Sequence, residues 1–278
     1  MKEILDFKYK EQGSDCFINK KHTHTFHYEL LHIHSGSGVI MVGERLFPIE
    51  KDTLVLINGI DIHCSVPDNP AEYVRSKIVI SSEFIQKIAA DAKLSDVIQD
   101  LFIRSNGLCV KLREDETNFV DLEMKKIEGF LAKKSIYQTA SVMLSLFQII
   151  LCAHQNLHRD ITTLNNKTAE IIAYLNQNLD HKISLDELCH HFHISKYYLC
   201  HTFKKTFGMT IYNYIFAQRI SIAKRKLIYT NESLTEISLS TGFSSSSYFS
   251  KTFKEYEGIS PKDFRKKHQS SAIISLFN

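Results

Sequence analysis

The pattern of apolar and polar residues changes its period along this chain, and the first 80 residues carry the two-residue period of β-strands. Turn-forming segments such as Gly43-Glu44-Arg45 and Pro67-Asp68-Asn69-Pro70 separate short apolar runs. The runs lie at residues 29–34, 39–42, 46–49, 53–57 and 73–80. Several short strands at close spacing predict a small barrel or sandwich over residues 1–80.

The period becomes helical from about Ser82 onward. Apolar side chains recur three and four residues apart over residues 84–102, 119–131 and 142–151. We therefore expect residues 81–160 to form helices, which either cover the predicted barrel or pair with a second subunit. The stretch 158–167 is polar and rich in turn formers, so we place a linker there.

The last part of the chain contains the same helical unit twice. The segment from Asp186 to Gly208 recurs from Thr235 to Gly258, with a numbering offset of 49 early in the unit and 50 from Tyr198 onward. Such a repetition indicates two copies of one supersecondary structure. The change of offset places one extra residue between the two helices of the second copy.

Each copy predicts a short helix, a tight turn and a second helix. Ser184-x-x-Glu187 and Ser233-x-x-Glu236 are both capping-box patterns, which mark the start of the short helix. Gly242 can adopt the positive φ of a helix C-terminus and ends the short helix of the second copy. The helix that follows keeps one apolar and one polar face, which is the arrangement of a helix-turn-helix motif.

The composition is that of an ordinary globular protein, with 278 residues, 44% hydrophobic and 23% charged. The sequence contains no run of 18 apolar residues, and its N-terminus lacks the apolar core of a signal peptide. We therefore expect a cytoplasmic protein that does not bind a membrane. The six cysteines are scattered without a C-x-x-C pair, so neither a disulfide framework nor a cysteine zinc site is predicted.

The net charge of +3 is distributed unevenly along the chain. Residues 161–278 hold 15 Lys and Arg against 9 Asp and Glu, whereas residues 1–160 hold 19 against 22. The positive surplus therefore belongs to the part with the doubled helical unit. A surplus of this sign suits a phosphate backbone, because bound phosphates release their condensed counterions, although it also fits a solvated surface.

The doubled unit and the helix between its copies share many fixed spacings with one known family. The positions that match are Ser184-Leu185, Leu188, Ser195, Tyr198-Leu199, Phe203-Lys204, Gly208, Arg219-Ile220, Ala223, Ile237, Gly242-Phe243, Tyr248-Phe249-Ser250, Phe253-Lys254, Gly258, Ser260-Pro261 and Phe264-Arg265. With them, residues 161–270 resemble the DNA-binding domain of AraC/XylS-type transcriptional regulators. The resemblance implies seven helices and two helix-turn-helix units, at about 184–205 and 233–254, whose second helices enter successive major grooves of double-stranded DNA.

The resemblance also indicates which side chains face DNA. The expected DNA-binding residues are Lys196, Tyr197, Cys200, His201, Lys204 and Lys205 in the first unit, and Ser245, Ser246, Ser247, Ser250, Lys251 and Lys254 in the second. Neither set contains an arginine for a bidentate contact with guanine, so we expect weaker base contacts and more reliance on DNA shape. Outside such a motif, the same residue types are more often packing or solvated surface.

Four residues near the N-terminus follow the spacing of cupin barrels: His22, His24, Glu29 and His63. Cupin-like N-terminal domains are common in AraC/XylS-type regulators, where they bind a small effector, and the same four positions hold a divalent ion in metal-binding cupins. The second cupin motif is incomplete here, since Lys51 and Ile57 replace its glycine and proline. We therefore favour an effector pocket lined by these four residues, with no metal and no cofactor, and keep a metal site as the alternative.

Together these patterns predict an α+β multidomain protein. It has a cupin-like β-barrel (1–80), a helical segment that forms a dimer (81–160) and an all-α DNA-binding domain (161–270). The predicted function is a transcriptional activator controlled by a small molecule, with sugars a frequent effector class in the family. Its expected partners are double-stranded DNA, RNA polymerase and a second copy of the chain.

Two other classes of protein remain as alternatives. The first is a cupin metalloenzyme with an appended DNA module, against which the incomplete second motif counts. The sequence also has no Gly-rich phosphate loop, nucleophile elbow or H-E-x-x-H motif, so we do not predict an enzyme. The second alternative is a constitutive architectural DNA binder, which a specificity ratio near one would distinguish.

Overall fold

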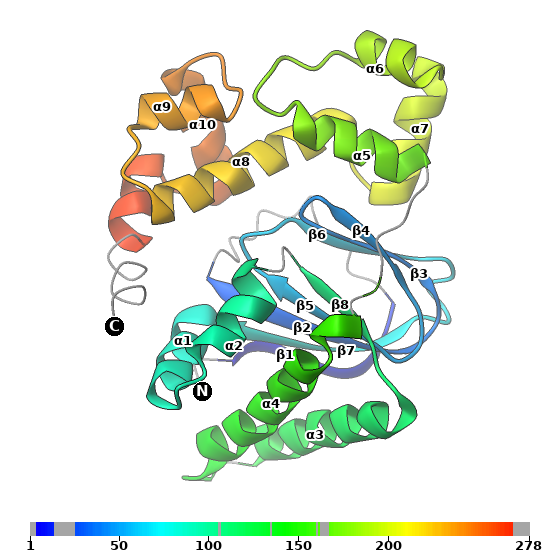
Figure 1. The fold of residues 1–278 in the computed structure, drawn as a ribbon, viewed down its shortest axis with the longest axis vertical. Helices are drawn as coiled ribbons and strands as arrows, with labels where there is room; N and C mark the ends of the chain where they lie inside the picture. The colour runs from blue at the N-terminus through cyan, green and yellow to red at the C-terminus, as the bar shows by residue number, and fades with distance from the viewer. Residues whose placement is uncertain are drawn as a thin grey trace. The chain divides into compact units, whose positions relative to one another are not determined.

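The computed structural model describes residues 4–13, 26–104, 107–133, 135–159, 161 and 167–268. It divides into two compact units. The first contains the β-sheets and the helices that follow them, and the second contains the doubled helical unit (Figure 1). The segment Ile60–Cys64 is grouped with the second unit.

Two β-sheets form the framework of the first unit. The strands are β1 (Ile4–Gln12), β2 (His27–Ser35), β3 (Gly38–Val42), β4 (Arg45–Ile49), β5 (Thr53–Asn58), β6 (His63–Pro67), β7 (Val74–Ser81) and β8 (Leu108–Lys111). One sheet has the order β1-β7-β2-β5-β8 and the other the order β4-β3-β6. All strands predicted from the two-residue period are present.

The predicted barrel is not closed. Among the described residues the hairpin β3–β4 pairs with β6, and no strand of the three-stranded sheet pairs with an edge of the five-stranded sheet. The predicted fold class, a β-sheet domain followed by helices, is confirmed. Instead of closing into a barrel, the two sheets face each other across an apolar layer. Ile33 and Val55 from the larger sheet meet Ile40 and Phe47 from the smaller one in this layer.

Strand β2 lies in the middle of the larger sheet and contributes to two cores. It pairs along its length with β5 and β7. Because successive side chains of a strand point to opposite faces, Leu31 and Ile33 enter the layer between the sheets, whereas Leu30 enters the core shared with the helices. This double burial explains why residues 30–33 are apolar or buried without interruption.

Helices cover the other face of the larger sheet, as one of the two predicted alternatives requires. They are α1 (Ser82–Asp91), α2 (Ser95–Ile98), the π-helical turn η1 (Gln99–Arg104), α3 (Glu114–Ala132), α4 (Gln138–Gln155) and the 3-10 turn η2 (Leu157–Arg159). Helices α3 and α4 lie side by side below the sheet in Figure 1. Val120, Met124 and Leu146 join Leu30 and Ile78 of the sheet in one core. The exception to the helical prediction is β8, which pairs with β5.

The second unit contains seven helices among its described residues, in agreement with the number that the resemblance implies. They are α5 (Lys167–Gln177), α6 (Leu185–Phe192), α7 (Lys196–Phe207), α8 (Ile211–Tyr229), α9 (Leu234–Ser240), α10 (Ser246–Glu257) and a last helix over 261–268. Helix α8, about 28 Å long at 1.5 Å per residue, runs between the pairs α6–α7 and α9–α10 (Figure 1).

Two chemical expectations can be compared with the described residues. None of the helices there is long and apolar enough to cross a membrane. Cys64 is disulfide-bonded, contrary to the expectation from the scattered spacing, because residues distant along a chain can meet once strands pair. Cys109, Cys152, Cys189 and Cys200 are free thiols.

Candidate nucleic-acid interface

The two copies begin with the predicted serine caps, but only one forms a complete capping box. Ser233 Oγ accepts a hydrogen bond from the Glu236 amide at 3.2 Å, and Glu236 accepts one from the Ser233 amide at 2.7 Å. Ser184 Oγ accepts from the Glu187 amide at 3.1 Å. The Glu187 carboxylate accepts instead from the Tyr174 hydroxyl at 2.9 Å, which ties α6 to α5.

The turns between the helices also differ. In the second copy Gly242 adopts a φ of 78°, as predicted, and the chain turns there. A Cβ at this position would lie 2.1 Å from the Leu179 carbonyl oxygen and 2.8 Å from the Arg219 guanidinium. In the first copy His193 takes the left-handed conformation, with a φ of 53°. A histidine in this conformation was not predicted, because glycine is the usual signal for it.

The second helix of each pair, α7 or α10, is delimited in the same way. Ser195 and Ser245 cap the N-termini, and each hydroxyl oxygen accepts a backbone amide hydrogen bond of 3.1 Å. Gly208 and Gly258 end the helices with φ of 68° and 77°. These shared local signals give two helices of 12 residues each.

Phenylalanines hold the inner face of each of these helices. Phe203 contacts Phe207 and Tyr214, with ring centroids 4.7 and 5.6 Å apart. Phe253 contacts Phe249 and the ring of Phe264 in the last helix, at 5.6 and 5.2 Å. Because one face of each helix is fixed in the core, the opposite face is presented to solvent.

The sequence-predicted DNA-binding residues lie on that opposite face or at its margin. The exposed ones are Lys196, Tyr197, Cys200, His201, Lys204 and Lys205 of α7, and Ser245, Ser247, Lys251 and Lys254 at or in α10. Ser246 and Ser250 are half-buried. The structure therefore brings each set together on one helix surface, where it is accessible to a ligand.

Four of these side chains already have a partner within the protein. Tyr197, 79% exposed, stacks on His201 with ring centroids 5.6 Å apart and planes at 16°. Lys196 Nζ lies 3.2 Å from Asp186 Oδ1, and this hydrogen bond raises the pKa of Lys196. The Ser245 hydroxyl caps α10. No sequence pattern pointed to the Lys196–Asp186 pair, because its members belong to different helices.

Buried polar residues of α8 tie this helix to α5 and to α10. Gln218 donates a 2.8 Å hydrogen bond to the Tyr214 hydroxyl, which in turn donates to Asn176 of α5 at 2.9 Å. Lys224 Nζ lies 3.1 Å from the Glu257 carboxylate of α10, and both side chains are buried. The sequence did not predict these polar contacts, because most of them join different helices.

Two of the four predicted effector residues, Glu29 and His63, lie within the described parts of the chain. Glu29 lies in β2, opposite Ile57 and Val79, and is partly buried. His63 begins β6, in the segment grouped with the second unit, and its Nδ1 lies 3.0 Å from its neighbour Asp61's carbonyl oxygen. His22 and His24 lie outside the described residues.

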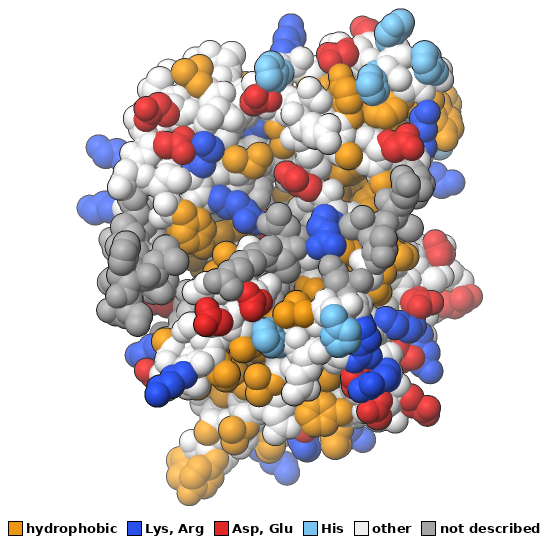
Figure 2. Space-filling model, viewed as in Figure 1, with side chains coloured by type: hydrophobic (Ala, Val, Ile, Leu, Met, Phe, Trp, Pro, Cys, Tyr) orange, Lys and Arg blue, Asp and Glu red, His pale blue; other side chains and the backbone are white. Residues whose placement is uncertain are grey.

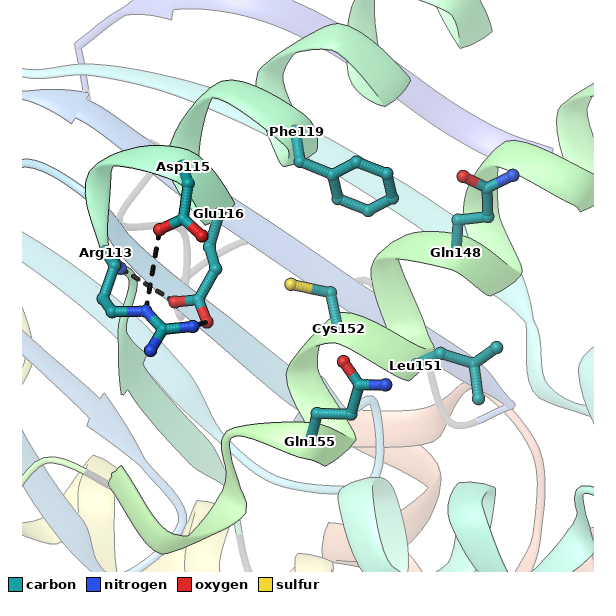
Figure 3. A pocket seen from close by; sticks show the side chains of 8 residues that line it. All are labelled: Arg113, Asp115, Glu116, Phe119, Gln148, Leu151, Cys152 and Gln155. Atoms are coloured by element: carbon teal, nitrogen blue, oxygen red, sulfur yellow. Dashed lines mark hydrogen bonds and ion pairs between the residues drawn. The ribbon is translucent and has the colours of Figure 1, made fainter.

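A surface pocket of about 530 Å³ lies elsewhere in the first unit, between the start of α3 and the end of α4. Its lining residues are Arg113, Asp115, Glu116, Phe119, Gln148, Leu151, Cys152 and Gln155. Figure 3 shows the Arg113 guanidinium turned toward Asp115 and Glu116, at 3.6 and 2.8 Å. No sequence pattern pointed to this pocket, because it arises where two helices diverge.

Comparison with known proteins agrees with the two-unit division. The AraC-like ligand binding domain matches residues 6–115, and a helix-turn-helix domain matches residues 188–267. The HTH-type transcriptional activator AarP of Providencia stuartii is 37% identical over 97 residues, which are 35% of this chain and 72% of AarP.

Two further relatives differ in how much of the chain they share. The uncharacterized HTH-type transcriptional regulator YdiP of Escherichia coli (strain K12) is 36% identical over 101 residues, 36% of this chain but only 33% of YdiP. The uncharacterized HTH-type transcriptional regulator YfiF of Bacillus subtilis (strain 168) is 25% identical over 277 residues, covering 92% of this chain and 81% of YfiF. Both the ligand-binding and the helix-turn-helix parts thus have counterparts among transcriptional regulators, and the chain belongs to the AraC-type family of DNA-binding transcriptional regulators.

Proposed function

We propose that this chain is a transcriptional activator whose DNA binding is controlled by a small molecule held in the N-terminal unit. The observation that carries the proposal is the pair of capped recognition helices, α7 and α10, each with its polar face exposed and both fixed on α8. An effector shifts such a system only if it prefers one of its conformational states. Sugars are the effector class that we would test first.

In this proposal the two recognition helices enter successive major grooves. Tyr197, Cys200 and His201 of α7 contact base edges, and Ser246, Ser247, Ser250 and Lys251 of α10 do the same. The ammonium groups of Lys196, Lys204, Lys205 and Lys254, with the capped helix N-termini, contact phosphates and position the domain. Apart from Ser246 and Ser250, which are half-buried, these side chains are exposed, and their exposure supports the assignment.

We place the effector in the part of the chain that matches a ligand-binding domain, at His22, His24, Glu29 and His63. Support comes from the match of residues 6–115 to a ligand-binding domain.

We further propose that helices α3 and α4 form the contact with a second copy of the chain. Large apolar side chains are exposed on them and on the turn that joins them: Phe119, Leu122, Ile136, Tyr137 and Leu144. Ile136 is 89% exposed and Leu144 68%. Figure 2 shows hydrophobic side chains gathered at the lower end of the first unit. Exposed apolar surface of this kind is typical of a protein contact.

Binding of the full chain to the DNA upstream of its own coding sequence tests the proposal. Fluorescence anisotropy at fixed salt would compare that DNA with a scrambled duplex, with and without a panel of sugars and other small metabolites. We expect affinity for the upstream DNA to exceed that for scrambled DNA by about 10³ or more, and one metabolite to change it. A ratio near one under every condition would instead indicate an architectural DNA binder.

The activator role needs a separate measurement. In vitro transcription with RNA polymerase from the upstream promoter should rise when the chain and its effector are both present. A fall in transcript would show a repressor, and would leave the DNA-binding part of the proposal in place.

A further inference from the structure

The first unit contains a group of potential metal ligands that is separate from the predicted effector residues. His32 and His34 lie two residues apart on β2, and Asp121 lies on α3. One ligand atom from each lies within 4.8 Å of the others, and this is the one such group of three among the residues that the structure describes. On β2 these two histidines share the helix-covered face with Leu30, whereas Glu29 belongs to the opposite face.

The His32 side chain gives an independent indication that a ligand belongs here. It is 0% exposed, and neither ring nitrogen has a hydrogen-bond partner. A buried polar atom without a partner is uncommon in native proteins, because its lost hydration is not replaced. A ring nitrogen without a proton can donate its lone pair to a metal ion.

The hydrogen bond between His34 and Ser76 orients the ring so that its Nδ1 lies toward the Asp121 carboxylate. Its Nε2 lies 2.7 Å from Ser76 Oγ, and its Nδ1 lies 3.6 Å from Asp121 Oδ1. Ser76 Oγ also accepts the Lys10 amide at 3.0 Å. With Nε2–H donating to Ser76, the Nδ1 lone pair faces Asp121, which is the usual outer-shell arrangement of a metal-binding histidine.

A lysine now pairs with the carboxylate of this group. Lys10 Nζ lies 3.2 Å from Asp121 Oδ2, and the Tyr9 hydroxyl donates to Asp121 Oδ1 at 3.1 Å. The Lys10 side chain is 46% exposed. It can therefore turn into solvent and leave the carboxylate to another cation.

We propose that His32, His34 and Asp121 bind a divalent transition-metal ion, which displaces the Lys10 ammonium from Asp121. Two imidazoles and one carboxylate suit zinc, iron, cobalt, nickel or manganese, and three protein ligands leave a coordination position for water. Two atoms bound to one tetrahedral ion at 2.0–2.2 Å lie about 3.3–3.6 Å apart. The His34–Asp121 pair, at 3.6 Å, already has this spacing, and the widest separation in the group, up to 4.8 Å, needs to close by about 1.2–1.5 Å at most.

The test is a titration of the full-length, untagged chain with Zn²⁺ and with Co²⁺ after dialysis against a chelator. Isothermal titration calorimetry and elemental analysis give affinity and stoichiometry, and the visible absorption of Co²⁺ reports its ligands. We expect one ion per chain. His32→Leu and Asp121→Asn should each weaken binding about tenfold or more, whereas the exposed controls His158→Gln and Glu128→Gln should not change it.

Lys10→Met gives a readout that misfolding cannot imitate, because the expected change is a gain. Removing the competing ammonium should tighten binding, by roughly tenfold for a partly screened charge about 4 Å from the ion. Ser76→Ala should weaken binding, since His34 loses the group that orients it.

Three outcomes overturn the proposal. The first is equal affinity in the wild type and all of these variants. The second is no stoichiometric binding by either the wild type or Lys10→Met. The third is binding that survives His32→Leu but is lost in the double variant His22→Asn/His24→Asn, which would assign the ion to the cupin-like residues.

Discussion

Replacing Gly242 with alanine should destabilise the second helix-turn-helix unit far more than the same change at Gly258. Both glycines have a left-handed φ, 78° and 77°. They differ in surroundings, since a Cβ at Gly258 meets nothing within 4 Å, whereas one at Gly242 meets the Leu179 carbonyl and the Arg219 guanidinium. The pair therefore separates backbone strain from a steric clash.

The magnitude of the Gly242→Ala effect has two parts. An alanine in the left-handed region costs about 1–2 kcal/mol at either position. At Gly242 the new Cβ also displaces Arg219, which donates hydrogen bonds of 2.8 and 2.6 Å to the carbonyls of Leu179 and His181. Losing one hydrogen bond from a charged group costs about 1.5–3 kcal/mol. We expect a total of about 2.5–5 kcal/mol for Gly242→Ala and about 1–2 kcal/mol for Gly258→Ala.

Thermal unfolding of the full chain, followed by far-ultraviolet circular dichroism, measures both variants. For a unit of about 100 residues, 1 kcal/mol corresponds to a Tm change of roughly 4–8 °C. The Tm of the second compact unit should fall at least twice as far in Gly242→Ala as in Gly258→Ala. Equal shifts would refute the reasoning, because the clash would then contribute nothing beyond the strain that both positions share.

Three further predictions concern binding and pH. Lys251→Ala should weaken specific operator binding more than Lys262→Ala, which removes the same charge outside the recognition helices; equal losses would remove Lys251 from the interface. Burial acts to raise the pKa of Glu116, but hydrogen bonds from Arg159 and the Arg113 amide outweigh it and lower the pKa from 4.5 to about 2. Its carboxylate therefore stabilises the fold fully above pH 4.5, and that contribution is lost as the pH falls through 2. Glu116→Gln should flatten this part of the stability curve in acid titrations, and an unchanged curve would contradict the assignment. Exchanging the base-facing residues of α7 and α10 should alter operator preference, measured by selection from random duplexes; an unaltered preference would mean that the two helices contribute equally.

The second unit could be predicted closely from the sequence because its signals are local. Serines cap α7, α9 and α10, glycines end α7 and α10, and apolar residues recur at helical spacing between them. Each signal acts within one turn of the chain, so no knowledge of the tertiary fold is needed. The first copy departs where a tertiary contact competes, since Glu187 bonds Tyr174 instead of completing its capping box.

The first unit was less predictable because pairing between distant segments decides its structure. The run Leu108–Lys111 is only four residues long and lies between helical patterns, and it becomes β8 because β5 offers a free edge. Whether two sheets close into a barrel depends likewise on edge pairing that no local pattern encodes. The group of His32, His34 and Asp121 has the same origin, since the strand alternation places the histidines on one face, but only the packing of α3 brings the carboxylate to them.

The recognition helices α7 and α10 differ in their exposed side chains, and this difference indicates how the two helix-turn-helix motifs share the recognition of DNA. On α7 the exposed Tyr197 and His201 are large and stack on each other. Because the stacking already limits their side-chain conformations, each loses less conformational entropy when it binds DNA. On α10 the Ser245 hydroxyl is engaged in the cap, and Ser246 and Ser250 are half-buried and short. Short side chains bring the helix backbone close to DNA but reach few base edges. We therefore expect α7 to supply most of the sequence discrimination, while α10 docks the domain and relies on Lys251 for its longest polar contact.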